Sequence, residues 1–308
     1  MAGSVWIVLV LLLGAGVAWA LRPVRTLGPA SPSQAWVAAE RHARRVTASA
    51  WAALLPLPFL LGMGAGGALH GPSRGAFVAA LPGIAGIAFL AVHAAGELTW
   101  PRPQGAVRRA PLVRRRIRDV APRALSGLTV AWFVLLGTLL TVCGLAAGTG
   151  GRSLSALHAD GATSTSSPFP GVYYGRTIAP AMLVLALGCL GVLALVARRA
   201  AVCDTSPADD TALRRTSARR VLAGVQLAVA WTLAGCLLFA ASSVASVQPR
   251  WADAFGPGSA ESVGAVGRVA ALALVVASVV VAVRASRSDR RAPEPQDVGD
   301  HARPRVSA

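Results

Sequence analysis

Seven long apolar blocks are the feature that most limits what this chain can fold into. Each block is about 18 to 23 residues long, which lets a helix cross roughly 30 Å of hydrocarbon. Backbone groups in lipid must be paired within their own segment, so each block is expected to be a helix. The predicted fold class is an all-α integral membrane bundle. Its seven transmembrane helices are expected at 4–21, 46–68, 76–96, 125–147, 177–196, 221–241 and 263–283.

The composition agrees with this fold class. Hydrophobic residues make up 54% of the chain and charged residues only 14%, whereas soluble domains carry about 25% charged residues. We therefore treat residues 1–283 as one membrane domain. The tail at 284–308 is polar and contains proline, and we expect it to be disordered.

The positions of the arginines predict the orientation in the membrane. The chain has no lysine, and its net charge of +17 comes from 30 arginines. Short arginine-rich loops stay in the cytoplasm. When successive spans cross the membrane in alternating directions, all but five arginines lie in loops or tails on the same side. The exceptions are Arg74, Arg152, Arg176, Arg250 and Arg268. We expect a multi-pass protein of the bacterial plasma membrane, with its N-terminus outside and its C-terminus cytoplasmic. Because this topology explains the charge, no nucleic-acid partner is expected.

The segment 91–123 carries the densest charge, with eight arginines and two acidic residues. Residues 107–120 can form a short amphipathic helix with Val113, Ile117 and Val120 on its apolar side. Such a helix lies on anionic lipid, and an acidic surface of a partner protein would satisfy the same charges. The expected contact residues are Arg108, Arg109, Arg114, Arg115, Arg116 and Arg118.

Glu97 stands at the end of the third block, immediately before these arginines. An unpaired carboxylate at the edge of hydrocarbon is costly, and an arginine fork binds it through two hydrogen bonds. We expect a structural ion pair between Glu97 and Arg102, with Arg108 as the alternative partner. Glu97 also lies four residues after His93, so the two side chains can share one helix face. A pair of that kind can move protons.

Three of the expected spans open alike, which suggests an internal repeat. The openings at 43–49, 121–127 and 218–224 are ARRVTAS, APRALSG and ARRVLAG, and a tryptophan follows each one. The chain would then consist of one helix followed by three helical hairpins, an arrangement found in other membrane bundles. Chance similarity in a chain rich in alanine and arginine is the alternative.

The second apolar block contains breaks and small residues. A short helix at 35–45 is expected to lead into it, and Pro56 and Pro58 must kink it. The spacing of Gly62 and Gly66 permits close contact between helices, and a substrate path lined by the broken helix is the alternative reading. In the sixth block, the amide of Gln226 is expected to tie two helices together.

Three short motifs carry a resemblance to known proteins. They are GELTWPRP at 96–103, PGVYYG at 170–175 and LRRTSARRV at 213–221. The chain resembles uncharacterised actinobacterial polytopic membrane proteins over most of its length. The resemblance implies a bacterial source and a multi-pass topology, and it implies no activity.

The sequence contains no recognisable catalytic signature. The phosphate-binding loop, the nucleophile elbow and the zinc-hydrolase helix motif do not occur, and the five histidines lack ligand spacing. His70, His158 and Asp160 could share a metal only if folding gathers them. We therefore expect no catalytic residue, no cofactor and no metal. The expected function is that of a non-enzymatic, transporter-like or accessory membrane subunit that contacts membrane lipids and a partner membrane protein. The alternative is an intramembrane enzyme or uncoupled carrier that uses His93 and Glu97 or polar residues of the outer segments.

Overall fold

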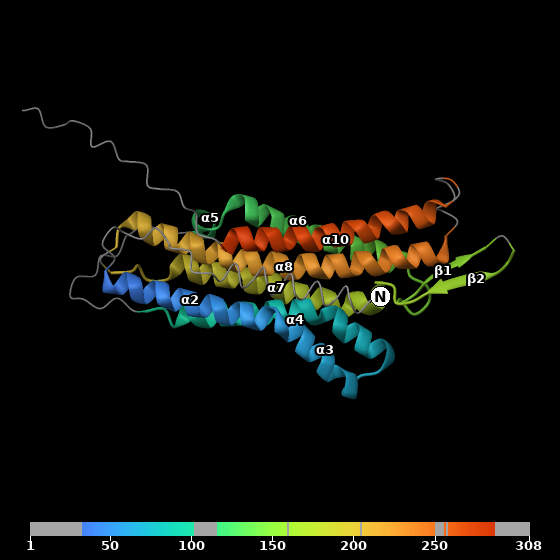
Figure 1. The fold of residues 1–308 in the computed structure, drawn as a ribbon, viewed down its shortest axis with the longest axis horizontal. Coiled ribbons are helices and arrows are strands. Elements are labelled where there is room, and N and C mark those ends of the chain that lie inside the picture. The colour runs from blue at the N-terminus through green and yellow to red at the C-terminus, as the bar shows by residue number, and fades with distance from the viewer. Residues whose placement is uncertain are drawn as a thin grey trace, which may run out of the picture.

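The computed structural model describes residues 33–101, 116–158, 160–203, 205–249, 256 and 258–286. These residues are mostly helical, with one small β-hairpin (Figure 1). The elements are α2 (Gln34–Leu54), α3 (Pro56–Ala68), α4 (Gly71–Leu98), α5 (Ile117–Val120), α6 (Arg123–Ala146), β1 (Leu154–Leu157), β2 (Thr163–Ser166), α7 (Val172–Arg198), α8 (Pro207–Val247) and α10 (Ser259–Ser286).

Six helices are long and apolar enough to cross a membrane, counting α2 and α3 together as one at Gln34–Ala65. They correspond to the second to seventh helices expected from the sequence. The predicted class, an all-α bundle of several membrane-length helices, is confirmed. The first expected span, 4–21, and the tail beyond residue 286 lie outside the described residues.

Helix α8 is the centre of the bundle. It is 41 residues long and lies between α10 and α7 in Figure 1. Val221, Val225 and Val229 along it are fully buried. The sixth span was expected to begin near residue 221, which is wrong because the helix begins at Pro207. Ser206 starts it by accepting a hydrogen bond from the Asp209 amide at 3.1 Å, and proline suits the first helical position.

Small residues join α8 to α10, and we call this contact the α8–α10 seam. A Cβ atom added at Gly264 would lie 2.5 Å from the Cβ of Ala245, and one added at Gly267 would lie 2.6 Å from the Cβ of Ala241. The two helices therefore approach more closely there than larger side chains would allow. Further along the seam, Gln226 Nε2 donates to the carbonyl of Ser278 at 2.8 Å. The expectation that Gln226 ties two helices together is confirmed.

The second apolar block is broken where its prolines predict. α2 ends at Leu54 and α3 begins at Pro56, and α3 leans away from the axis of α2 in Figure 1. The expected entry helix at 35–45 is continuous with the block, because α2 starts at Gln34 and is capped by Ser33, whose hydroxyl accepts from the Trp36 amide at 3.2 Å. A Cβ at Gly62 would meet Leu81 at an ordinary 3.4 Å, so the glycine spacing does not produce close helix contact at that residue.

The β-hairpin between α6 and α7 was not predicted. Its strands pair antiparallel, from Leu154 opposite Ser166 to Leu157 opposite Thr163. The side chains of β1 alternate between buried and exposed, and Leu154 and Ala156 pack against the far end of α8. Ser164 Oγ also donates to the carbonyl of Val247 at 2.9 Å. The hairpin thus covers the last turns of α8.

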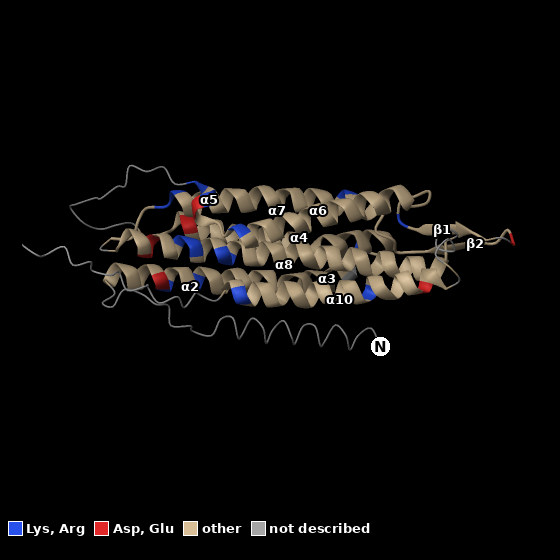
Figure 2. Ribbon diagram, turned by 90° about the horizontal axis from the view of Figure 1, so that it is seen from above, with Lys and Arg blue, Asp and Glu red and all other residues tan. Residues whose placement is uncertain are grey.

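Charged residues gather at one end of the bundle (Figure 2). This end contains the first turns of α2 and α8 and the last turns of α4 and α7, and we call it the arginine-rich end. The opposite end, which carries β1 and β2, is called the hairpin end. The separation of charge agrees with the pattern from which the topology was predicted.

Candidate functional site at the arginine-rich end

Helix α4 brings the first acidic side chain to this site. The helix ends at Leu98, and Pro101 follows two residues after its C-cap, Thr99. A residue before proline is disfavoured in the helical conformation, which explains why the chain leaves the helix before Trp100. Glu97 therefore occupies the last turn of α4, and the Trp100 ring lies just beyond it.

Glu97 forms a buried ion pair with Arg199, the residue after α7. Nη1 of Arg199 lies 3.3 Å from each carboxylate oxygen, and the side chains of Arg199 and Glu97 are only 2% and 7% exposed. The same nitrogen donates to Ser217 Oγ at 3.1 Å, and the guanidinium carbon lies 3.9 Å from the centre of the Trp100 ring. Burial lowers the pKa of Arg199, and the charge of Glu97 opposes that shift. This one arginine ties together the ends of α4 and α7 and the first turns of α8.

An arginine partner for Glu97 was expected from the sequence, but Arg199 was not identified. Arg102 and Arg108, which were named as partners, lie outside the described residues. In the structure, both oxygens of the Glu97 carboxylate accept hydrogen bonds from the Arg199 guanidinium.

A second buried arginine, Arg214, closes the end of α7. Its Nε donates to Asp210 Oδ2 at 2.8 Å, and both side chains are 3% exposed. Its Nη1 donates to the carbonyls of Val196 and Ala197 at 2.9 and 3.1 Å, and its Nη2 donates to the carbonyl of Arg199 at 2.8 Å. The last carbonyls of a helix lack partners within the helix. Arg214 supplies those partners and so fixes the position of Arg199.

Helix α2 covers the other side of the site. His42 Nε2 donates to the carbonyl of Gly96 at 2.9 Å, and Arg220 Nη1 donates to Thr47 Oγ1 at 3.3 Å. Gly96 lies so close to Val46 that an added Cβ would clash with the valine side chain. Glycine at this position therefore allows α2 and α4 to pack together.

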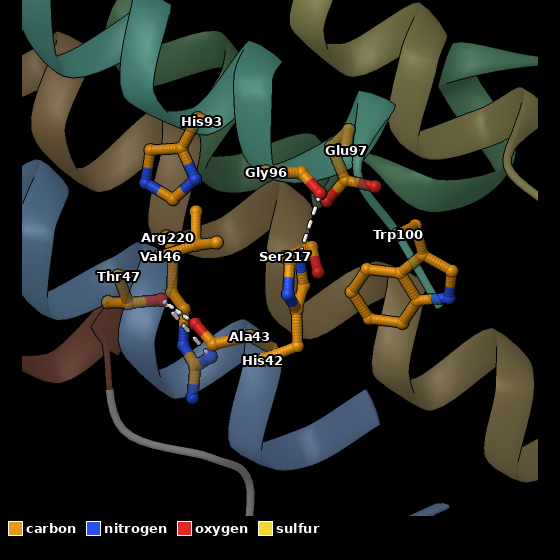
Figure 3. Close-up of a pocket in the computed structure, with 10 residues that line it drawn as sticks. All are labelled: His42, Ala43, Val46, Thr47, His93, Gly96, Glu97, Trp100, Ser217 and Arg220. Atoms are coloured by element: carbon orange, nitrogen blue, oxygen red, sulfur yellow. Dashed lines mark hydrogen bonds between the residues drawn. The ribbon is translucent and has the colours of Figure 1, made fainter. Parts of the chain in front are cut away.

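A small cavity remains between α2, α4 and α8, as Figure 3 shows. About 10 Å³ of it is open to the centre of a water-sized sphere, which is room for about one water molecule. The lining residues are His42, Ala43, Val46, Thr47, His93, Gly96, Glu97, Trp100, Ser217 and Arg220.

His93 is the most deeply placed titratable side chain of the cavity. It is 4% exposed, its ring centre lies 4.6 Å from that of Phe89, and its Nε2 has no hydrogen-bond partner among the described residues. His93 and Glu97 both line the cavity, as their spacing of four residues indicated. Within the described part of the chain, no hydrogen bond joins them directly.

Two of the six expected lipid-contact residues are described. Arg116 and Arg118 are exposed at the start of α5, whereas Arg108, Arg109, Arg114 and Arg115 lie outside the described residues. Arg116 is extended and its amide donates to Asp119 Oδ2 at 2.8 Å, so the helix starts at Ile117 and does not run back through Arg116. The expectation of one continuous helix over 107–120 is therefore wrong at Arg116. Val120 is buried and Ile117 packs against the core, so these two residues of the expected apolar stripe face the protein and not the lipid surface on which the stripe was expected to lie.

The polar residues at the hairpin end have structural contacts. His158 Nε2 is hydrogen-bonded to Ser164 Oγ at 2.7 Å, and Asp160 Oδ1 accepts from the Ala162 amide at 3.0 Å within the turn of the hairpin. In the described part of the chain, no three His, Cys, Asp or Glu side chains come together as metal ligands would.

The contribution of α8, which supplies Asp210, Arg214, Ser217 and Arg220, was not predicted from the sequence. A signal for it was present, because Ser206 and Asp209 have the spacing of a capping box. A helix starting there places Asp210, Arg214 and Ser217 on one face, at intervals of four and three residues. Because the sixth span was expected to begin only at residue 221, this face was not predicted.

The site thus consists of two arginine–carboxylate pairs and a third arginine beside a small cavity. This arrangement joins four helix ends, and both of its carboxylates already accept from arginine. The chain matches no protein-family model, no curated protein and no solved structure.

Proposed function

We propose that this chain is a non-enzymatic multi-pass membrane protein, of a transporter-like or accessory kind, whose arginine-rich end faces the cytoplasm. That end contacts anionic lipid or the acidic surface of a partner membrane protein. The proposal combines the six membrane-length helices with the charge separation seen in Figure 2.

The observation that carries the proposal is where the buried charged groups lie. Within the described residues, every buried acidic, basic or histidine side chain is at the arginine-rich end; these are His93, Glu97, Arg199, Asp210 and Arg214. Along the rest of the described interior, the buried polar side chains are hydroxyls and the amide of Gln226. Ion-coupled transporters place ionisable groups inside the membrane span, along the ion path. A supporting or anchoring role fits this interior better than a coupled pump does.

The orientation follows from the same charges. Moving arginine across a bilayer is costly, so short loops rich in arginine remain cytoplasmic. The exposed Arg116 and Arg118 and the neighbouring Arg108, Arg109, Arg114 and Arg115 would then face the inner leaflet, which is rich in anionic lipid.

Lipid retention tests this proposal. The full chain is purified in mild detergent and its bound lipids are identified by native mass spectrometry. Replacing Arg114, Arg115, Arg116 and Arg118 with glutamine should strip the retained anionic lipid, since each arginine near an anionic surface is worth about 1 kcal/mol, roughly fivefold in affinity. The matched control replaces Arg74, Arg152 and Arg176, on the expected outer side, and should retain the lipid. Equal retention in both variants would contradict the proposed contact.

One observation favours a second candidate, an uncoupled carrier or intramembrane enzyme. His93 Nε2, which has no hydrogen-bond partner among the described residues, lines the same cavity as Glu97. The two candidates differ in what the purified protein does in liposomes. A flux or turnover that disappears in His93→Phe but survives the arginine substitutions would favour the carrier or enzyme.

A further inference from the structure

We propose that the cavity between α2, α4 and α8 binds a small monovalent anion of the size of chloride. This site is separate from the lipid contact proposed above, which uses the exposed arginines. The proposal rests on the charge balance around the cavity, on a lining side chain that has no partner among the described residues, and on the size of the cavity.

The first step is the charge balance. Arg199 is paired with Glu97 and Arg214 with Asp210, so these four groups cancel. Arg220 is different, because its hydrogen bond at 3.3 Å goes to the neutral hydroxyl of Thr47. The described part of the cavity therefore carries one positive charge in excess, and an uncompensated charge away from water is unfavourable.

The neighbouring turn of α2 does not remove this excess. Arg44 and Glu40 both act on Arg220, with opposite signs. Arg44 Nη2 and Glu40 Oε1 form an ion pair of their own at 2.7 Å, and so they add no net charge. His42, at the rim, donates its Nε2 proton to the carbonyl of Gly96.

The second step is the unpartnered side chain. His93 is more than nine-tenths buried, lines the cavity from α4 and feels the charge of Arg220 (Figure 3). A neutral imidazole carrying its proton on Nε2 can donate one hydrogen bond there, and a buried polar atom left unpaired is unfavourable. An anion would accept from His93 and balance Arg220 at the same time. A proton or metal cation would instead add a second positive charge beside Arg220.

The third step is size. The cavity has room for about one water molecule. Chloride is a single atom somewhat larger than a water molecule, so the side chains around the cavity must move slightly to hold it, whereas phosphate and carboxylates contain several heavy atoms and do not fit. Glu97 also lines the space, but both of its oxygens accept from Arg199, which neutralises its repulsion of an anion.

The test measures thermal unfolding of the full chain in mild detergent at constant ionic strength, with chloride replacing gluconate, which is too large for the cavity. Binding to the folded state raises the unfolding midpoint with the logarithm of ligand concentration above Kd. We expect chloride and bromide to raise the midpoint by a few degrees and gluconate to have no effect.

Two variants and a control locate the effect. His93→Phe keeps an aromatic ring beside Phe89 and removes the donor, so the chloride concentration for half effect should rise by about tenfold or more, as expected for one hydrogen bond to a charged group. Arg220→Gln should abolish the chloride response. Arg215→Gln changes an exposed arginine on the same helix and should leave the response intact.

A midpoint that is equal in chloride and gluconate would overturn the proposal and leave water as the occupant of the cavity. An unchanged half-effect concentration in His93→Phe would overturn it as well. If Arg220→Gln does not fold, the His93→Phe titration decides the question alone.

Discussion

Helix α8 is held in two different ways at two places along its length. In its first turns, at the arginine-rich end, the contacts are polar: Ser217 bonds Arg199, and Arg214 bonds Asp210 and the end of α7. Along the α8–α10 seam, small residues bring the two backbones together and Gln226 adds one hydrogen bond.

The difference shows how a membrane bundle can combine specificity with tight packing. Without a hydrophobic driving force between helices in lipid, the seam depends on close packing, which tolerates small changes of register. A buried ion pair has one favourable geometry and becomes costly when either partner is lost. We infer that the arginine-rich end fixes which helix ends meet, and that the seam fixes how closely α8 and α10 approach.

The largest effect is expected from Arg199→Met. The substitution leaves the Glu97 carboxylate buried without its partner, and breaking a buried pair in this way costs about 3–5 kcal/mol. This loss of stability should lower the thermal unfolding midpoint in mild detergent more than either of the other single substitutions described below.

The control for this variant removes both charges. Arg199→Met combined with Glu97→Leu leaves no stranded carboxylate and should recover most of the lost stability. If the double variant is as unstable as the single one, the ion pair is not the interaction that matters at this site.

A smaller effect is expected at the seam, from Gly264→Val. The added side chain collides with Ala245, and overpacking of this kind costs about 1–3 kcal/mol. The same substitution at Gly137 in α6, where an added Cβ meets nothing within 4 Å, serves as the matched control and should change the unfolding midpoint much less. Equal losses at Gly264 and Gly137 would mean that helix propensity, and not the close approach, explains the result.

The smallest effect is expected from Gln226→Leu. It removes the hydrogen bond to the Ser278 carbonyl, and such bonds between membrane helices average about 0.6 kcal/mol. The leucine side chain also adds apolar packing in place of the amide, so the thermal unfolding midpoint should change very little. A drop as large as that of Gly264→Val would show that the seam depends on this amide.

The sequence predicts the membrane-length helices and the role of Gln226 better than it predicts the arginine-rich end. Length and apolarity locate the membrane-length helices, and Pro56 marks the break between α2 and α3 because proline removes a backbone donor. Gln226, as an isolated amide in an apolar block, points to a contact between helices. These features depend on nearest neighbours in the chain or on a single residue type.

The partner of Glu97 could not be found in the same way. Arg199 lies about a hundred residues further along, and only the packing of α4 against α7 and α8 brings the two together. Nearby arginines such as Arg102 were the more obvious choice by sequence distance. The β-hairpin was missed for a related reason, since Leu154 and Ala156 become recognisable as a buried strand face only once the end of α8 is in place.

The most direct test of the account is to determine which side of the membrane each end of the bundle occupies. Reporter fusions after Ser126 and Ser206 probe the arginine-rich end, and fusions after Ser164 and Ser246 probe the hairpin end. If arginine-rich loops stay inside, the first two reporters should be active in the cytoplasm and the other two outside it. A reporter of either end found on the opposite side would contradict the topology and, with it, the proposed contact between the arginine-rich end and the inner leaflet.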